Sequence, residues 1–191
     1  NGTHMEAPWH YQSHDKDGNR MQTIDELPLD WFFRPGVKLD FRNKPDGYVI
    51  EPHDILEELN RIEYKLQPMD IVLFNTKASE FYGKDGYLEH GIGIGKDATL
   101  FLTCDNGIRV TGIDAWGWDA PFFLAKEQYA KDGDALKVWQ GHWAGIEQPY
   151  CHMEKLLNLE KLPAHGFLVS CFPWKIKDAS AGFVRAVAMF D

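Results

Sequence analysis

Three side chains that can bind a metal ion or transfer a proton lie within the first ten residues of the chain. They are His4, Glu6 and His10, in the segment Gly-Thr-His-Met-Glu-Ala-Pro-Trp-His of residues 2–10. Alternate side chains of an extended segment point to the same side, so His4 and Glu6 should project together, and Pro8 should disfavour a helix. Two imidazoles beside a carboxylate suit a hydrolytic metal centre, which needs ligands and a base that is not a ligand. The alternative is a solvated pair of surface histidines, which is common.

A second group of ligand-type residues lies between His142 and Glu154, in the segment His-Trp-Ala-Gly-Ile-Glu-Gln-Pro-Tyr-Cys-His-Met-Glu. Gly145 and Pro149 predict that this segment is a loop. Imidazole and carboxylate are borderline-hard ligands, so His142 and Glu154 suit zinc or manganese. A polar loop with incidental histidines is the alternative, and the segment taken alone slightly favours that loop.

Several other polar residues have a structural explanation beside a chemical one. Asp114 follows an apolar run, where α/β enzymes place functional groups, but we expect it and Asp119 to brace the following loop. His90 precedes the glycine-rich residues 91–95, which resemble a phosphate-binding loop only loosely, so we expect a flexible turn there or a histidine that faces a pocket. Surface or structural roles are expected for the remaining histidines, His14, His53, His152 and His165.

The composition excludes several classes of protein. The chain has 191 residues, of which 44% are hydrophobic and 26% charged, and this is typical of one globular domain with a sizeable core. A formal net charge of −9 argues against nucleic acid as a partner, because phosphate binding needs a basic face. No apolar run approaches the length of a membrane span. The three cysteines, Cys104, Cys151 and Cys171, predict buried thiols in a reducing compartment, and we expect a cytoplasmic protein.

The middle of the chain alternates between the patterns of strands and helices. Residues 37–41 alternate between apolar and polar types, and the apolar runs at 70–76 and 108–113 suit buried strands. Apolar residues at helical spacing predict helices over residues 52–66 and 95–106. This order of elements predicts an α/β core.

The C-terminal part of the chain shows weaker patterns. Residues 126–138 are expected to be helical or loop-like, and residues 165–172 and 182–190 are expected to be strands. Neither repeats nor linkers interrupt the sequence, so we expect a single domain.

The segment at residues 2–10 resembles the signature of the cyclase family of metal-dependent hydrolases, which includes bacterial kynurenine formamidase, isatin hydrolase and trans-dienelactone hydrolase. The motif of that family reads His-x-Gly-Thr-His-x-Asp-x-Pro-x-His. Residues 112–114 are similar to its Gly-Thr-Asp, residues 154–159 to its Glu-Asn-Leu-x-Asn-Leu, and residues 179–188 to its closing Ser-Pro-Val-Arg-Ala-Val-Ala. The resemblance covers nearly the whole chain and implies a mixed β-barrel-like sheet with flanking helices, often in a dimer or tetramer.

The resemblance implies a role for each matched residue. His4 corresponds to a metal ligand, Glu6 to a carboxylate that can bridge two metals, and His10 to a general base or acid. Two-metal members of the family complete the site with a histidine and a glutamate twelve residues apart, and His142 and Glu154 have this separation. We therefore prefer a metal site to a polar loop for this second segment.

Two departures from the family motif matter. The first histidine of the motif would precede Asn1, so we expect residues 1–191 to form one domain that lacks its N-terminal segment. Glu6 stands where the family has aspartate. Its additional methylene moves the carboxylate by about one carbon–carbon bond, which bears on metal spacing and occupancy.

The predicted activity is hydrolysis of an amide, formamide, lactone or cyclic amide by water that a divalent zinc or manganese ion activates. His10 would transfer a proton to the leaving group. An aromatic or flat small-molecule substrate is indicated by tryptophans near the motifs, namely Trp9, Trp116, Trp118 and Trp143. The alternatives are a non-catalytic small-molecule-binding protein on the same scaffold and a structural metal domain with closed coordination. We expect a homodimer or homotetramer that binds neither nucleic acid nor membranes.

Overall fold

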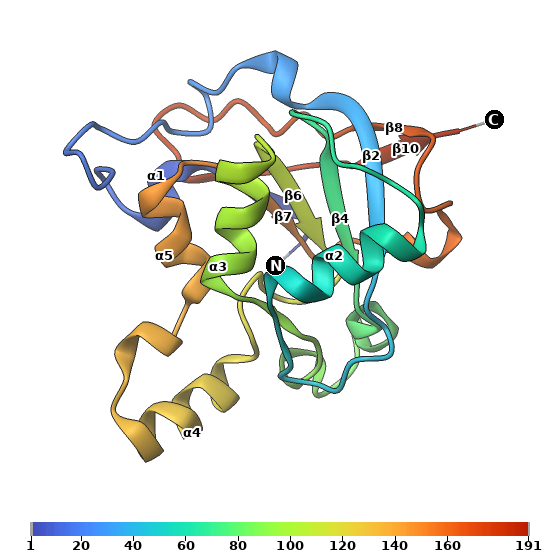
Figure 1. The fold of residues 1–191 in the computed structure, drawn as a ribbon. Helices are drawn as coiled ribbons and strands as arrows, with labels where there is room; N and C mark the ends of the chain where they lie inside the picture. Colours follow the sequence, from blue (N-terminus) through green and yellow to red (C-terminus); the bar gives the residue numbers. More distant parts are fainter. Residues whose placement is uncertain (1, 191) are drawn as a thin grey trace.

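An eight-stranded sheet runs through the computed structural model, which describes residues 2–190 (Figure 1). In the order in which they pair, its strands are β10 (Val187–Met189), β8 (Phe167–Ser170), β2 (Phe33–Asp40), β4 (Ile71–Asn75), β6 (Val110–Ile113), β7 (Cys151–Glu154), β1 (His4–Glu6) and β9 (Ala181–Phe183). The pairs β2–β4, β4–β6 and β6–β7 are parallel, and the other pairs are antiparallel. The sheet is therefore mixed. A second, parallel pair consists of β3 (Val49–Ile50) and β5 (Gly93–Ile94).

The helices flank this sheet, and α4 extends away from the rest of the fold in Figure 1. The α-helices are α1 (Pro8–Tyr11), α2 (Pro52–Arg61), α3 (Lys96–Leu100), α4 (Phe122–Asp132) and α5 (Gln140–Glu147). A π-helical turn, Phe101–Asp105, continues α3, and short 3-10 turns lie at Leu29–Trp31, Ala78–Phe81, Tyr87–Glu89, Ala135–Lys137 and Leu159–Lys161. None of the helices within residues 2–190 combines the length and the apolar character that crossing a membrane requires.

The two edges of the sheet are joined by a very short link. Strand β9 ends at Phe183 and β10 begins at Val187, yet the two strands lie at opposite ends of the strand order. Because a residue extends the chain by at most about 3.6 Å, this link holds the edges within about 15 Å of each other. The sheet must therefore curl into a half-barrel. The predicted α/β fold, with a β-barrel-like mixed sheet and flanking helices in a single domain, is confirmed.

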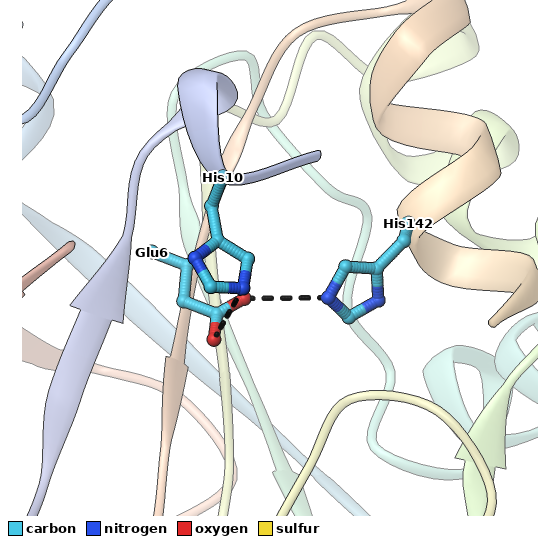
Figure 2. A group of neighbouring side chains, drawn as sticks. All are labelled: Glu6, His10 and His142. Atoms are coloured by element: carbon cyan, nitrogen blue, oxygen red, sulfur yellow. Dashed lines mark ion pairs between the residues drawn. The ribbon is translucent and has the colours of Figure 1, made fainter. Parts of the chain in front are cut away.

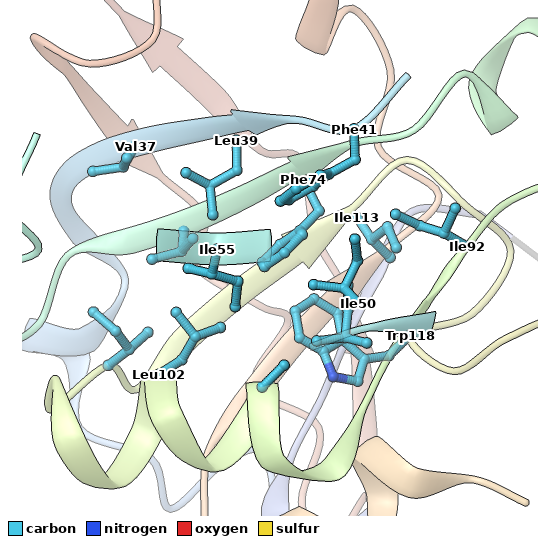
Figure 3. Packing of buried hydrophobic residues seen from close by; sticks show 14 of the residues in the cluster. Val37, Leu39, Phe41, Ile50, Ile55, Phe74, Ile92, Leu102, Ile113 and Trp118 are labelled. Atoms are coloured by element: carbon cyan, nitrogen blue, oxygen red, sulfur yellow. The ribbon is translucent and has the colours of Figure 1, made fainter. Parts of the chain in front are cut away.

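Apolar side chains cover both faces of the sheet because successive side chains of a strand point to opposite faces. Figure 3 shows the core on the face toward α2 and α3, where Leu39, Phe74 and Ile113 from the strands meet Ile55 and Leu102 from the helical segments. The intervening strand residues pack into a second core on the other face, formed by Met5, Ile71, Leu73, Val110, Met153 and Phe167 with loop residues. The two cores hold the central strands firmly in register.

The predicted alternation of strands and helices in the middle of the chain is confirmed. The apolar runs form β2, β4 and β6, and the segments with helical spacing form α2 and α3 with its π-helical extension. Helix α2 ends at Arg61, earlier than residue 66, because Glu63 adopts a left-handed conformation with a φ of 53°. Ile62 and Leu66 are still buried against the same core.

Three local predictions were wrong. Pro8 starts helix α1 instead of preventing it, because the first helical position needs no backbone N–H and suits the fixed φ of proline. The segment from His142 to Glu154 is not a loop, since it contains most of α5 and all of β7. Residues 182–190 are two strands at opposite edges of the sheet instead of one.

The cysteines differ in exposure although all three are free. Cys151 and Cys171 are buried in the second core, as predicted. Cys104 is exposed, which corrects the prediction, because it lies on the outer side of the π-helical turn while its neighbours Leu102 and Thr103 face inward.

We expect Gly145→Ala to destabilise the fold. A Cβ atom at Gly145 would lie only 2.2 Å from Cδ2 of Tyr11, so α1 could no longer pack closely on α5. Overpacking of this kind costs about 1–3 kcal/mol in the free energy of unfolding, which urea denaturation would measure. The control is Glu57→Ala at an exposed position of α2, which should leave stability nearly unchanged. A Gly145→Ala protein as stable as the wild type would contradict this packing.

Candidate active site

The pairing of β1 with β7 brings four polar side chains onto one face of the sheet. His4 lies opposite Glu154, and Glu6 lies opposite His152, in the antiparallel register. These residues alternate with Met5 and Met153, which point into the second core. The four polar side chains therefore face the helices, where His152 is fully buried and both glutamates are 5% exposed.

Two short helices add a histidine each. Helix α1 follows β1 after a single residue and carries His10, whose Nε2 lies 3.4 Å from Oε1 of Glu6. Helix α5 carries His142, whose Nε2 lies 3.5 Å from Oε2 of Glu6. Figure 2 shows both imidazoles pointing at the Glu6 carboxylate from different elements. Gly145 makes this possible, because it lets α5 approach the ring of Tyr11 in α1.

Glu6 is the centre of the cluster. Its carboxylate oxygens lie within 3.5 Å of imidazole nitrogens of four histidines: His4 at 3.4 Å, His10 at 3.4 Å, His142 at 3.5 Å and His152 at 3.0 Å. The longer side chain of glutamate, compared with aspartate, thus reaches all four rings. Two overlapping sets of side chains could each hold a metal ion, and both contain Glu6: one with His10 and His142, the other with His4 and Glu154.

Neighbouring groups fix the orientation of the imidazoles. Nδ1 of His142 donates to Oδ2 of Asp119 at 2.5 Å, and Nδ1 of His4 contacts the carbonyl oxygen of Gly2 at 3.0 Å. The hydroxyl of Tyr11 lies 3.0 Å from Nδ1 of His152. Each of these three rings therefore turns its Nε2 atom toward the carboxylates. Such partners are typical of metal-binding histidines, because they fix the ring and its tautomer.

The charges in the cluster shift several pKa values. Burial alone would raise the pKa of the Glu6 carboxyl, but the positive imidazoles around it, above all that of His152, hold the pKa well below its usual range. Burial would also lower the pKa of His142, yet the carboxylates of Asp119 and Glu6 raise it to about 10. In contrast, burial lowers the pKa of His10 despite the nearby Glu6. His10 is therefore neutral near pH 7 and able to accept a proton.

The donor set fits a divalent metal ion. Oε2 of Glu6 and Nε2 of His152 are buried and make no hydrogen bond of good geometry with any described residue, although they lie 3.0 Å apart. Buried polar atoms without partners are rare and call for an explanation such as an ion. Imidazoles and carboxylates are the usual ligands of zinc and manganese in proteins. Metal binding would also replace the protons that the carboxylates stabilise on these imidazoles.

A cavity of about 730 Å³ opens above the cluster, within the usual range for small-molecule sites. His4, Glu6, His10, His142 and Glu154 all line it. Its walls are rich in aromatic side chains, namely Tyr11, Trp116, Trp118, Phe122, Trp139, Trp143 and Phe183. Trp9 is not among the lining residues of the described chain, which corrects its predicted place, because its ring packs against Arg20 instead.

The structure brings together all five predicted site residues, His4, Glu6, His10, His142 and Glu154, in one cluster. Sequence reasoning missed the part that His152 plays, because the segment was expected to be a loop. In a strand, its position two residues before Glu154 would have placed it on the same face.

Three further polar residues have clear structural surroundings. Asp119 holds His142 and also accepts the backbone N–H of Gly141 at 2.7 Å, so it braces the start of α5. The Asp114 carboxylate accepts hydrogen bonds from the backbone N–H and the hydroxyl of Thr76, and it thereby braces the segment after β4. His90 lines the cavity, and its ring stacks on that of Phe81.

Comparisons with known proteins agree with this fold. Residues 1–120 match the model of a protein family described as "Putative cyclase". Isatin hydrolase A from Labrenzia aggregata, bound to benzyl benzoate, is 24% identical and superposes with a TM-score of 0.79 over 99% of this chain and 72% of that chain. Isatin hydrolase A from Ralstonia solanacearum is 22% identical and superposes with a TM-score of 0.81 over 100% of this chain and 72% of that chain.

A third solved structure, described as a potential metal-dependent hydrolase with cyclase activity, is 25% identical and has a TM-score of 0.68 over 98% of this chain and 77% of that chain. Among curated proteins, none matches this sequence. The family match and the His/Glu cluster together fit a divalent metal.

Removal of the Asp119 charge should have a pH-dependent effect on the metal-free protein. The pKa of His142 is about 10 in the folded protein, while an unfolded histidine titrates near 6.5. The proton on His142 therefore stabilises the fold fully below about pH 6.5, and this stabilisation is lost as the pH rises toward 10. We expect Asp119→Asn to cost more stability at pH 7 than at pH 10, by about 1.4 kcal/mol for each unit by which it lowers this pKa.

Urea denaturation of EDTA-treated protein at both pH values would measure this difference. Asp17→Asn in an exposed loop is the matched control, because it removes a carboxylate that is remote from the cavity. Equal costs of Asp119→Asn at pH 7 and pH 10 would exclude the charge pair as a source of stability.

Proposed function

The chain belongs to the cyclase family, and from this membership we propose that it is a metal-dependent hydrolase. Its substrate would be a small aromatic or cyclic molecule with an amide, formamide, lactone or cyclic amide bond. The observation that carries the proposal is the set of imidazoles around the buried Glu6 carboxylate at the base of the cavity. A buried polar cluster that opens into an aromatic cavity is typical of a small-molecule active site.

We propose His4, Glu6, His142 and Glu154 as the residues that hold a divalent ion, either zinc or manganese. When bound, such an ion lowers the pKa of water and polarises a carbonyl oxygen. Asp119 would keep Nε2 of His142 directed at the site through the hydrogen bond to Nδ1. The deep burial of Glu6 and Glu154 would exclude bulk water from the ligands and strengthen their charges.

We propose His10 as the residue that transfers a proton to the leaving group. Its side chain is 37% exposed, so it can reach a bound substrate, while the other predicted site residues are more buried. Nδ1 of His10 lies 3.3 Å from the hydroxyl of Ser180, which would orient the ring. The lowered pKa favours a neutral imidazole at neutral pH, so His10 would first accept a proton from water and then pass it to the leaving group.

The aromatic walls support a flat substrate. Trp116, Trp139 and Trp143 line the cavity and are each between 43% and 53% exposed, so their ring faces are available for stacking. Trp118 is fully buried and stacks on His152, so it supports the cluster instead of contacting a substrate.

We also propose an oligomeric state and a location for the protein. A homodimer or homotetramer is supported by exposed apolar side chains at the two edges of the sheet, Phe183, Val187, Met189 and Phe190, which a second copy could cover. A cytoplasmic location is supported by the three free cysteines.

Metal removal tests the proposed function. We expect EDTA-treated protein to lose hydrolysis of aryl formamides and aryl lactones, and added manganese or zinc to restore it, because the carbonyl needs the charge of the ion. Alkyl formamides and alkyl lactones of similar size should be poorer substrates, since they cannot stack on the tryptophans. Full turnover without metal would refute the proposal. Metal binding with no hydrolysis of any substrate would favour a small-molecule-binding protein.

A His10→Ala variant tests proton transfer separately from metal binding. We expect kcat to fall about 100-fold to 10,000-fold, the usual contribution of a general acid or base, while the metal content stays that of the wild type. The control is His53→Ala, which removes an exposed histidine that does not line the cavity. A His10→Ala enzyme with unchanged kcat would remove His10 from the mechanism, and one without metal would make it a ligand.

A further inference from the structure

The side chains that line the cavity include more carboxylates than ammonium groups. Among the lining residues, all of which are described, Glu6, Asp119 and Glu154 are carboxylates, and Lys155 carries the one ammonium group. Lys155 is only 3% exposed, so its charge lies in the same buried environment as those of the two glutamates. A buried charge is costly unless it is paired and hydrogen-bonded, which indicates that Lys155 has a defined partner.

That partner is Glu154. Nζ of Lys155 donates to Oε2 of Glu154 at 2.7 Å and to the carbonyl oxygen of Trp116 at 2.7 Å, and it lies 4.7 Å from the centre of the Trp116 ring. The backbone of Lys155 has a φ of 60°, in the left-handed region that a lysine rarely adopts. Hydrogen bonds from Thr3 to its carbonyl oxygen and from its own N–H to Ala115 hold this conformation. The ammonium group is therefore fixed in place.

The two glutamates differ in how their oxygens are satisfied. In Glu154, Oε2 accepts from Lys155, while Oε1 accepts the backbone N–H of Trp118 at 3.3 Å and lies 3.4 Å from Nε2 of His152. In Glu6, Oε2 has no hydrogen-bond partner among the described residues. A lysine ammonium therefore already pairs with Glu154, whereas Oε2 of Glu6 has only imidazole neighbours and can bind a cation once those imidazoles are neutral.

We propose that the Lys155 ammonium takes the place of a second cation beside Glu154, so that the four ligands proposed above together hold one divalent ion, with Glu6 as the central ligand. This inference rests on the metal-dependent function proposed above. Three carboxylates and one ammonium give the cavity two negative charges, which one divalent ion neutralises when the imidazoles are neutral. A second divalent ion at Glu154 would lie close to a fixed positive charge in a poorly solvated site, where repulsion is strong.

The number of bound ions in the wild-type protein tests the inference. The full chain would be saturated with Mn²⁺, freed of unbound ion by gel filtration and analysed by elemental analysis and EPR. We expect one ion per chain and the EPR spectrum of an isolated Mn²⁺. Two ions with an exchange-coupled spectrum would overturn the inference and leave the proposed hydrolase intact. Protein that binds neither Mn²⁺ nor Zn²⁺ would refute the metal centre itself.

Variants of Lys155 test whether its charge limits the centre to one ion. Lys155→Met removes the charge but keeps most of the stem, and we expect it to double the metal content, whereas Lys155→Arg should keep one ion. Lys161→Met, at an exposed lysine outside the cavity, is the control and should also keep one ion. A folded Lys155→Met protein that still binds one ion would overturn the role of Lys155. If Lys155→Met does not fold, the number of ions bound per chain by the wild type and by Lys155→Gln tests the role of Lys155 instead.

Discussion

The antiparallel register between β1 and β7 is the constraint on which the rest of the site depends. It sets His4 against Glu154 and Glu6 against His152, so four polar side chains share one face while Met5 and Met153 anchor the other. A shift of one residue would turn the methionines toward the helices and the charged groups into an apolar core. The cost of burying those charges without partners makes any other register unfavourable.

The remaining histidines depend on a close approach of two helices instead of on the sheet. Tyr11 fills the space that the missing side chain of Gly145 leaves, and its ring also stacks on Tyr150 and His152. One aromatic residue thus couples the position of α1, the position of α5 and the orientation of a buried imidazole. The contacts of Tyr11 thus serve both the packing of the two helices and the orientation of His152, so a change in that packing would also disturb the site.

Much of the fold could be predicted because apolar periodicity reports directly on burial, as in β4 and α2. The five residues of the candidate cluster were found from their types together with the resemblance to the family motif. The helix of His142 and the strand of His152 were missed, since Gly145 and Pro149 are typical of loops and only tertiary packing shows that Gly145 serves a helix–helix contact. The salt bridge from Lys155 to Glu154 was likewise hidden, because adjacent side chains in an ordinary strand point apart and only the left-handed backbone at Lys155 brings them together.

Because of the short link between β9 and β10, the parts of the cavity wall differ in rigidity. Phe183 ends β9 and lines the cavity, and the link ties it to the opposite edge of the curled sheet, so this wall cannot swing outward without opening the half-barrel. Another part of the wall is Phe122 from α4, a helix without a single buried residue, and such weakly packed segments open at low free-energy cost. The part of the wall that α4 forms can therefore move at a lower cost in free energy than the part that β9 forms.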